Sequence, residues 1–286
     1  MTPSSVADAL RSGSFSAGWA VVRALPEPVA RRLFQAGADL ATRRGGKGID
    51  RLRANLARVA PEEDLTRDAV RSYARYWCEA FRLPVMGRER IIGGTVAVRE
   101  HLLRDSVAGP TGTILVLPHT GNWDAAGAWC GLTGAPFTTV AERLKPEALY
   151  ERFVAFRESL GMEVVALTGG ERPPSEVLEE RLRAGRTVCL LADRDLTPRG
   201  IDVEFFGATA RMPAGPAKLA LDTGANLMPT TLSFTPTGWQ IAFHPYVAHT
   251  DLARMTQDVA RVFETAIREH PADWHMLQKL WLEDLT

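Results

Sequence analysis

A histidine and an aspartate lie five positions apart just beyond an apolar run in this sequence. The run Leu115–Pro118 leads into His119, and Gly121 permits a tight turn before Asp124. Side chains at this spacing are about 140° apart on an ideal helix, so we expect His119 in the turn and Asp124 in the first turn of a following helix. A carboxylate bonded to one imidazole nitrogen makes the other a better base. The pair suggests a general base, although a surface turn with a helix cap has the same spacing.

A second group of charged side chains follows another apolar run. Asp193, Arg194 and Asp195 begin one residue beyond Thr187–Leu191. If the two runs are neighbouring strands, these carboxylates approach His119; otherwise they form an ion-pair network that holds loops together. The sequence has no Gly-x-Ser-x-Gly motif and no Cys/His cluster with zinc-ligand spacing. We therefore expect chemistry that needs neither a serine nucleophile nor a metal.

The elements that must position these residues follow a regular alternation after residue 110. Short continuous apolar runs, typical of strands buried on both faces, occur at Thr113–Leu117, Phe137–Val140, Glu163–Leu167 and Thr187–Leu191. The helical patterns between them cover Asn122–Leu132, Pro146–Leu160 and Ser175–Ala184. Later we expect strands near Asp202–Phe206, Met228–Phe234 and Gln240–His244, and helices over Ala214–Thr223 and Met255–Glu269. This alternation predicts an α/β fold, a mostly parallel central sheet flanked by helices, with ligands beyond the carboxyl ends of its strands.

The first 105 residues have a different pattern. Amphipathic spacing predicts helices over Ser14–Leu25, Val29–Arg43, Ile49–Val59 and Leu65–Arg82. No repeat or low-complexity linker separates this portion from the rest. We therefore predict one domain over residues 1–286, with a helical portion at 1–105 packed on an α/β core at 106–286.

The charges are balanced over the whole chain but not along it. The 34 basic and 34 acidic residues give a net charge of +0, which argues against a dedicated nucleic-acid binder. Residues 1–59 nevertheless hold only four acidic residues against ten basic ones, which are Arg11, Arg23, Arg31, Arg32, Arg43, Arg44, Lys47, Arg51, Arg53 and Arg58. A basic N-terminal segment of charge +6 thus precedes an acidic remainder of charge −6.

Cysteine usage and hydropathy limit where the protein could work. Cys78, Cys130 and Cys189 are far apart and in apolar surroundings, so we expect buried free thiols rather than a disulfide or a nucleophile. The longest uncharged runs, Val107–Trp123 and Ala125–Ala141, are too polar to cross a bilayer, and we find no convincing secretory signal. A soluble or peripheral protein is expected.

Several motifs together resemble the bacterial lipid A biosynthesis acyltransferase superfamily, and within it most closely the actinobacterial phosphatidylinositol mannoside acyltransferases. They are His119–Asp124 (HTGNWD), Asp193–Leu196 (DRDL), Glu204–Gly207 (EFFG), Arg211–Lys218 (RMPAGPAK) and Trp274–Trp281 (WHMLQKLW). The resemblance covers nearly the whole chain. It implies a fold like that of the glycerolipid acyltransferases.

The resemblance also implies roles for individual residues. His119 matches the general base, Asp124 the acid of the His-x4-Asp motif, and Asp193 an acidic residue that contacts the histidine. Glu142 and Arg157 match positions that line the acceptor groove. We further expect Asn122 and Trp123 to contact substrate, backbone amides of residues 120–122 to stabilise an oxyanion, and arginines to bind phosphate of CoA or of the acceptor. These arginines are Arg194, Arg199 and Arg211, the last of which could equally bond a carbonyl or carboxylate.

The implied reaction transfers a long-chain acyl group from acyl-CoA, a co-substrate, to a mannose hydroxyl of a phosphatidylinositol mannoside. No cofactor is required. The acceptor lies in the membrane, so we expect a peripheral enzyme on the cytoplasmic face. Its basic N-terminal segment, with Phe15, Trp19, Leu25 and Phe34, would meet an anionic surface; alternatively, these aromatic residues belong to the core. Two other functions remain open: acylation of another lipid (a lipid A-like sugar or a lysophospholipid), or lipid binding without catalysis.

Overall fold

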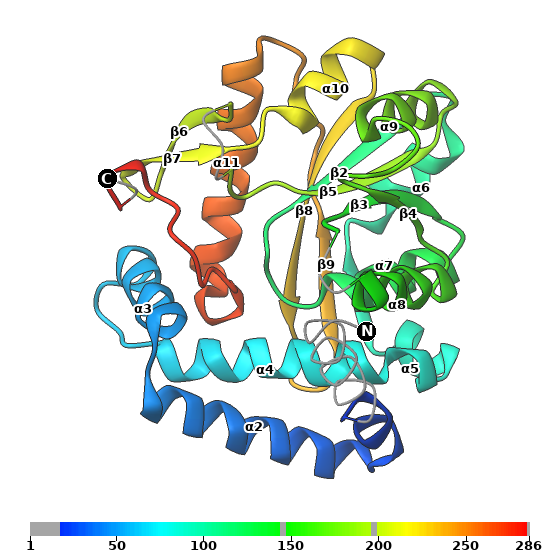
Figure 1. Ribbon diagram of the computed structural model, residues 1–286. Helices are drawn as coiled ribbons and strands as arrows, with labels where there is room; N and C mark the ends of the chain where they lie inside the picture. The colour runs from blue at the N-terminus through cyan, green and yellow to red at the C-terminus, as the bar shows by residue number, and fades with distance from the viewer. Residues whose placement is uncertain (1–17, 144–146, 196–198, 285–286) are drawn as a thin grey trace, which may run out of the picture.

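A seven-stranded sheet forms the centre of the computed structural model, which describes residues 18–143, 147–195 and 199–284 (Figure 1). Its strand order is β1-β9-β8-β2-β5-β3-β4, and its neighbours are parallel except for the antiparallel pair β8 and β9. The strands are β1 (Thr95–Val98), β2 (Thr113–Leu117), β3 (Phe137–Ala141), β4 (Glu163–Ala166), β5 (Thr187–Leu191), β8 (Asn226–Phe234) and β9 (Trp239–Phe243). A separate antiparallel hairpin joins β6 (Ile201–Phe205) to β7 (Ala208–Met212). The predicted fold class is confirmed.

Helices cover both faces of this sheet and form a layer beneath it in Figure 1, where α2 and α4 run side by side. Residues 18–24 are helical, and the α-helices that follow are α2 (Glu27–Arg44), α3 (Lys47–Val59), α4 (Thr66–Arg82), α5 (Arg88–Gly93), α6 (Glu100–Ala108), α7 (Trp123–Leu132), α8 (Glu147–Ser159), α9 (Pro174–Arg183), α10 (Gly215–Thr223) and α11 (Leu252–Glu269). Short 3-10 helices occupy Leu83–Val85, Pro271–Asp273 and Leu282–Asp284. No helix in the described ranges is both long and apolar enough to span a bilayer.

The burial of strand β2 explains why four of its five residues are apolar. All five of its residues are buried. Ile114 and Val116 join the core beneath α10 and α11, where Phe263 lies, whereas Leu115 and Leu117 join the opposite core. Each fully buried side chain of this size stabilises the fold by about 1.5–3 kcal/mol. Packing on both faces therefore holds the strand that leads to His119.

The N-terminal portion is not entirely helical, contrary to the expectation for residues 1–105. Thr95–Val98 forms the edge strand β1, parallel to β9, and α6 continues past the expected boundary to Ala108. Strand β7 was also not predicted. β1 has only four residues, none of them fully buried, so it lacks the continuous apolar run that marks the inner strands. The other predicted helices and strands in the described ranges are confirmed to within a few residues.

All three cysteines are free thiols, as expected. Cys78 and Cys130 are buried, and Cys189 is half-buried in β5. Burial raises the pKa of Cys78 to about 11 and that of Cys130 to about 12, so both thiols stay protonated at neutral pH.

Candidate active site

His119 and Asp193 are brought together by the register of two parallel strands. β2 pairs with β5 so that Leu117 lies opposite Leu191, and His119 and Asp193 each follow two residues later. The imidazole Nδ1 of His119 is hydrogen-bonded to Asp193 Oδ1. The backbone N–H of His119 donates to the other carboxylate oxygen, Oδ2, at 2.9 Å. Asp193 thus orients the ring, and Nε2 is the nitrogen left for a substrate.

The charge of Asp193 is stabilised although the side chain is fully buried. Burial raises its pKa, but the charge of His119 and hydrogen bonds from His119 and Trp274 outweigh burial and leave the pKa below its ordinary value. An ionised Asp193 keeps a proton on Nδ1 and stabilises the imidazolium that forms when Nε2 accepts a proton. The pair has the geometry of a general base with its orienting carboxylate.

Asp124 does not hold the imidazole, which corrects the expectation that this carboxylate bonds His119. Its Oδ2 accepts a hydrogen bond from the Tyr76 hydroxyl at 2.8 Å, and its Oδ1 accepts one from Arg157 Nε at 2.9 Å. The first turn of α7 directs the buried carboxylate toward α4 and α8 rather than back to the strand end. The charge of Asp124 raises the pKa of the Arg157 guanidinium, so that group stays protonated.

Asn122 is buried and has a structural role. It is the N-cap of α7: its Oδ1 accepts the Ala125 N–H, and its Nδ2 donates to buried Glu79. Glu79 also accepts hydrogen bonds from Arg75 and from the Trp239 indole. Asn122 therefore joins α7 to α4 and does not line the cavity, contrary to its predicted contact with substrate.

The predicted oxyanion donors are also partly occupied. The Thr120 amide donates to the Pro118 carbonyl at 2.8 Å, and the Gly121 amide donates to the Asp273 carbonyl at 2.9 Å. Gly121 has a φ of 56°, and a Cβ there would approach the Ser233 backbone nitrogen to 3.0 Å. Gly121 is thus required for the turn and for its close packing. Because the Thr120 and Gly121 amides already donate to carbonyl groups, neither is available to an oxyanion.

A cavity of about 630 Å³ opens at the His119 end of the sheet. Apolar side chains from β2, β3, β5, α9 and α10 form much of its wall. The predicted site residues that line it are His119, Trp123, Asp124, Glu142, Arg157 and Arg194. Arg211 is not among the lining residues; its guanidinium pairs with Asp202 at 2.8 Å on the β6–β7 hairpin. The size and composition of the cavity suit an apolar ligand held beside a few polar groups.

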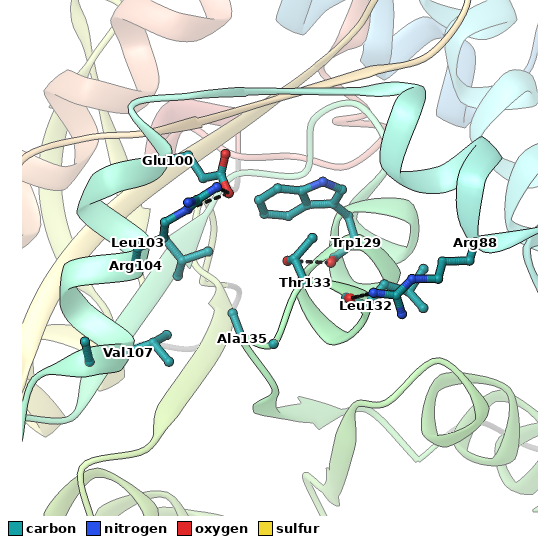
Figure 2. Close-up of a pocket in the computed structure, with 11 residues that line it drawn as sticks. Arg88, Glu100, Leu103, Arg104, Val107, Trp129, Leu132, Thr133 and Ala135 are labelled. Carbon is teal, nitrogen blue, oxygen red and sulfur yellow. Dashed lines mark hydrogen bonds and ion pairs between the residues drawn. The ribbon is translucent and has the colours of Figure 1, made fainter.

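A second hollow, of about 750 Å³, lies at the other end of α7 (Figure 2). Thr133 and Ala135 lead into β3 there, so the hollow is at the amino ends of the strands. Its charged groups are already engaged: Arg104 pairs with Glu100, and Arg88 donates to the Leu132 carbonyl. We assign the active site to the smaller cavity because His119 lines it.

Several residues of the site were not predicted as functional. Tyr76 donates a hydrogen bond to Asp124 and packs against Trp123, with ring centroids 4.1 Å apart and an interplanar angle of 32°. His275, expected to be structural, is buried near His119, and burial lowers its pKa to about 3, so its imidazole is neutral. The many aromatic residues in the α4 sequence could have pointed to Tyr76. Nothing in the sequence around Tyr76 or His275 indicates which residues they contact.

The basic N-terminal segment is organised differently from the expectation. Trp19 is buried and its ring contacts those of Phe81, Phe153 and Phe156, and the Phe34 ring also meets Phe81. Trp19 and Phe34 therefore belong to the protein's interior packing. Arg31 pairs with Glu27 and Glu79. Residues 1–17, with Arg11 and Phe15, lie outside the described ranges.

Comparisons with known proteins show the family of this chain. Residues 12–283 match the model of the bacterial lipid A biosynthesis acyltransferase family, and the chain belongs to that family. It is 50% identical over 280 residues to a phosphatidylinositol mannoside acyltransferase of Mycolicibacterium smegmatis, covering 95% of this chain and 91% of the relative. It is also 50% identical over 298 residues to a phosphatidylinositol mannoside acyltransferase of Mycobacterium tuberculosis, covering 99% and 92%. The chain is thus an acyltransferase by family.

Proposed function

We propose that this protein transfers a long-chain acyl group from acyl-CoA to a mannose hydroxyl of a phosphatidylinositol mannoside, with His119 as general base. The observation that carries the proposal is the oriented imidazole of His119 at the wall of an apolar cavity. The names of the two relatives support the choice of acceptor. A thioester donor provides a good leaving group, and the cavity accommodates its acyl chain.

The proposed reaction is a direct transfer. As the mannose oxygen attacks the thioester carbon, His119 Nε2 takes the hydroxyl proton, and Asp193 stabilises the resulting imidazolium. The tetrahedral intermediate collapses with formation of the ester and cleavage of the carbon–sulfur bond, and the imidazolium returns its proton to the CoA thiolate. Trp123 borders the imidazole, with ring centroids 5.7 Å apart. Arg194 and Glu142 are available in the cavity for a phosphate and for sugar hydroxyls.

The reaction is tested with purified protein, palmitoyl-CoA and a phosphatidylinositol mannoside. We expect the wild type to form the acylated glycolipid and His119→Ala to lower kcat by about a thousandfold or more. His101→Ala, at an exposed histidine on α6, is the matched control. Transfer to a lysophospholipid or a lipid A-like sugar but not to the mannoside would show that the proposed acceptor is wrong. A wild-type rate in His119→Ala would remove the proposed base and require a different mechanism, whereas the absence of transfer by the wild type to every acceptor would favour lipid binding without catalysis.

We place the enzyme at the cytoplasmic face of the membrane, where acyl-CoA and the lipid acceptor meet. The outer face of α2 supports this placement, because Val29, Leu33 and Leu40 project there with exposed fractions of 42%, 57% and 46%. The exposed side chains of Arg32, Arg43 and Arg44 flank this apolar stripe. Such a helix suits an interface in which apolar groups enter the headgroup region and cations meet anionic lipids.

Leu33→Asp is expected to weaken binding to vesicles containing phosphatidylinositol by about tenfold, because it removes an apolar contact and adds a repulsive charge. Folding should be unaffected, since Leu33 is already exposed in the free protein. The measurement is vesicle co-sedimentation at low and high salt, with Val107→Asp on α6 as the control at another exposed valine. Equal vesicle binding by Leu33→Asp and the wild type would show that this face of α2 is not the membrane-binding surface.

A further inference from the structure

Two of the motifs quoted above remain without a function after the site is described. Neither Glu204–Gly207 nor Trp274–Trp281 contributes a lining residue to the active-site cavity. The first forms the turn of the β6–β7 hairpin, and the second follows the 3-10 helix after α11. Their positions relative to His119 indicate what they do.

The chain around Trp274 runs antiparallel to the turn that carries His119. Thr120 and Trp274 form an antiparallel bridge. The His275 N–H donates to the His119 carbonyl at 2.9 Å, and the Gly121 N–H donates to the Asp273 carbonyl at the same distance. Backbone hydrogen bonds on both sides of His119 therefore attach its turn to the C-terminal segment.

Within this segment, the Trp274 side chain makes a direct contact with the carboxylate that orients His119. The Trp274 indole is fully buried, and its Nε1–H donates to Asp193 Oδ2 at 3.0 Å. The same oxygen accepts the backbone N–H of His119, while Oδ1 faces the imidazole. Three donors to its two oxygens thus fix the plane of a buried carboxylate.

The β6–β7 hairpin and the end of the chain hold the indole in place. The rings of Phe205, Phe206 and Trp281 lie 6.0, 6.1 and 6.2 Å from that of Trp274. Phe206 has a φ of 50°, a left-handed conformation that is costly for a bulky residue and persists here within this aromatic packing. The Trp281 indole in turn donates to the Phe205 carbonyl at 2.9 Å. Residues of both motifs therefore pack around the Trp274 indole.

We propose that Trp274 is a positioning residue for acyl transfer: its indole N–H holds Asp193 in the orientation that presents His119 Nε2 to the substrate. The inference rests on the proposed function for its catalytic consequence, but the hydrogen-bonded arrangement does not depend on which acceptor is used. The indole N–H also stabilises the negative charge of the Asp193 carboxylate. Without this donor, Asp193 becomes a stronger acceptor, and protonation of His119 becomes easier.

The first test compares Trp274→Phe with Trp281→Phe in the acyl-transfer assay. Both changes remove one buried indole N–H and leave an aromatic ring in the same cluster, but only Trp274 contacts Asp193. We expect Trp274→Phe to lower kcat by about ten- to a hundredfold, because the lost hydrogen bond is to a charged group. KM for acyl-CoA should stay within about twofold, and the acid limb of the pH–rate profile should move to higher pH. Equal effects of the two variants on kcat and pH profile would overturn the proposal, because they would indicate a purely structural role.

A second measurement requires neither enzymatic activity nor a variant with a smaller side chain at position 274. Incorporation of 3-benzothienylalanine at position 274 keeps the shape of the indole and replaces the N–H by sulfur. The protonation of His119 is then followed by NMR of histidine labelled at Cε1. Asp193 is hydrogen-bonded to this ring and the neutral His275 is close to it, and Asp124, Arg157, Arg194 and Asp195 line the same cavity; none of these groups is changed by the substitution. We expect the His119 titration to move to higher pH than in the wild type. An unchanged titration would overturn the proposal, whereas a shifted titration in a protein that acylates no acceptor would support it and contradict only the proposed function.

Discussion

Asp193→Asn is expected to lower kcat for acyl transfer by about three to four orders of magnitude, with the protein still folded. The asparagine side chain has one carbonyl oxygen, whereas Asp193 accepts hydrogen bonds from His119 and Trp274 through two oxygens. To satisfy the His119 backbone and Trp274 donors, that oxygen must take the place of Oδ2, and the amide nitrogen then faces Nδ1. The imidazole adopts the wrong tautomer, and Nε2 can no longer accept a proton.

The measurement is steady-state kinetics at saturating acyl-CoA, combined with thermal unfolding to verify the fold. Asp202→Asn is the control, since Asp202 is exposed and pairs with Arg211 outside the cavity. We expect this variant to differ from the wild type by less than about twofold. A kcat within tenfold of wild type for Asp193→Asn would show that His119 works without an orienting carboxylate, and the mechanism would have to change.

Arg157→Leu is expected to destabilise the protein by about 3–5 kcal/mol, because it leaves the charge of Asp124 buried without its partner. The carboxylate of Asp124 has an exposed fraction of only 2% and accepts from Arg157 and Tyr76. The neutral pair in the double variant Asp124→Asn/Arg157→Leu should recover most of this loss, since the asparagine oxygen still accepts from Tyr76. Denaturant unfolding of the three proteins gives the free energies.

The matched control is Arg172→Leu, which breaks an ion pair with Glu180 in which both side chains are 51% exposed. Pairs exposed to solvent are screened, so we expect a change below about 1 kcal/mol. If Arg157→Leu costs no more than Arg172→Leu, the Asp124–Arg157 contact is not a structural ion pair. If the double variant is stable but inactive, Asp124 or Arg157 contacts substrate in addition to supporting the fold.

The two carboxylates illustrate the limits of sequence reasoning about this site. The His-x4-Asp spacing correctly indicated that both residues belong to one strand–turn–helix unit, but it assigned the imidazole to the wrong partner. Asp124 is closer in the chain, whereas Asp193 is closer in space because β5 pairs directly with β2. Chain proximity constrains only the backbone path; the direction of a side chain in the first turn of a helix depends on the helices packed against it.

The N-terminal segment shows a related limit. Its charge and amphipathic spacing predicted helices correctly, but the same spacing does not distinguish a face that packs on the protein from one that meets a bilayer. Trp19 turned inward to meet Phe81, and Leu33 turned outward. Both are apolar residues at helical spacing, and only the other helices that pack against each position separate them.

The sequence by itself determined the local structure of this protein: buried apolar runs became strands, amphipathic stretches became helices, and polar residues after β2 and β5 marked the edge that carries the candidate active site. These features depend on residues near one another in the chain. The family resemblance implied that Asp193 contacts His119. Only the tertiary structure decided that β2 lies beside β5, that Asp193 and not Asp124 bonds the imidazole, and that Trp274, from the far end of the chain, holds that carboxylate. Strand order and register arise from the packing of the whole core, so no local pattern contains them.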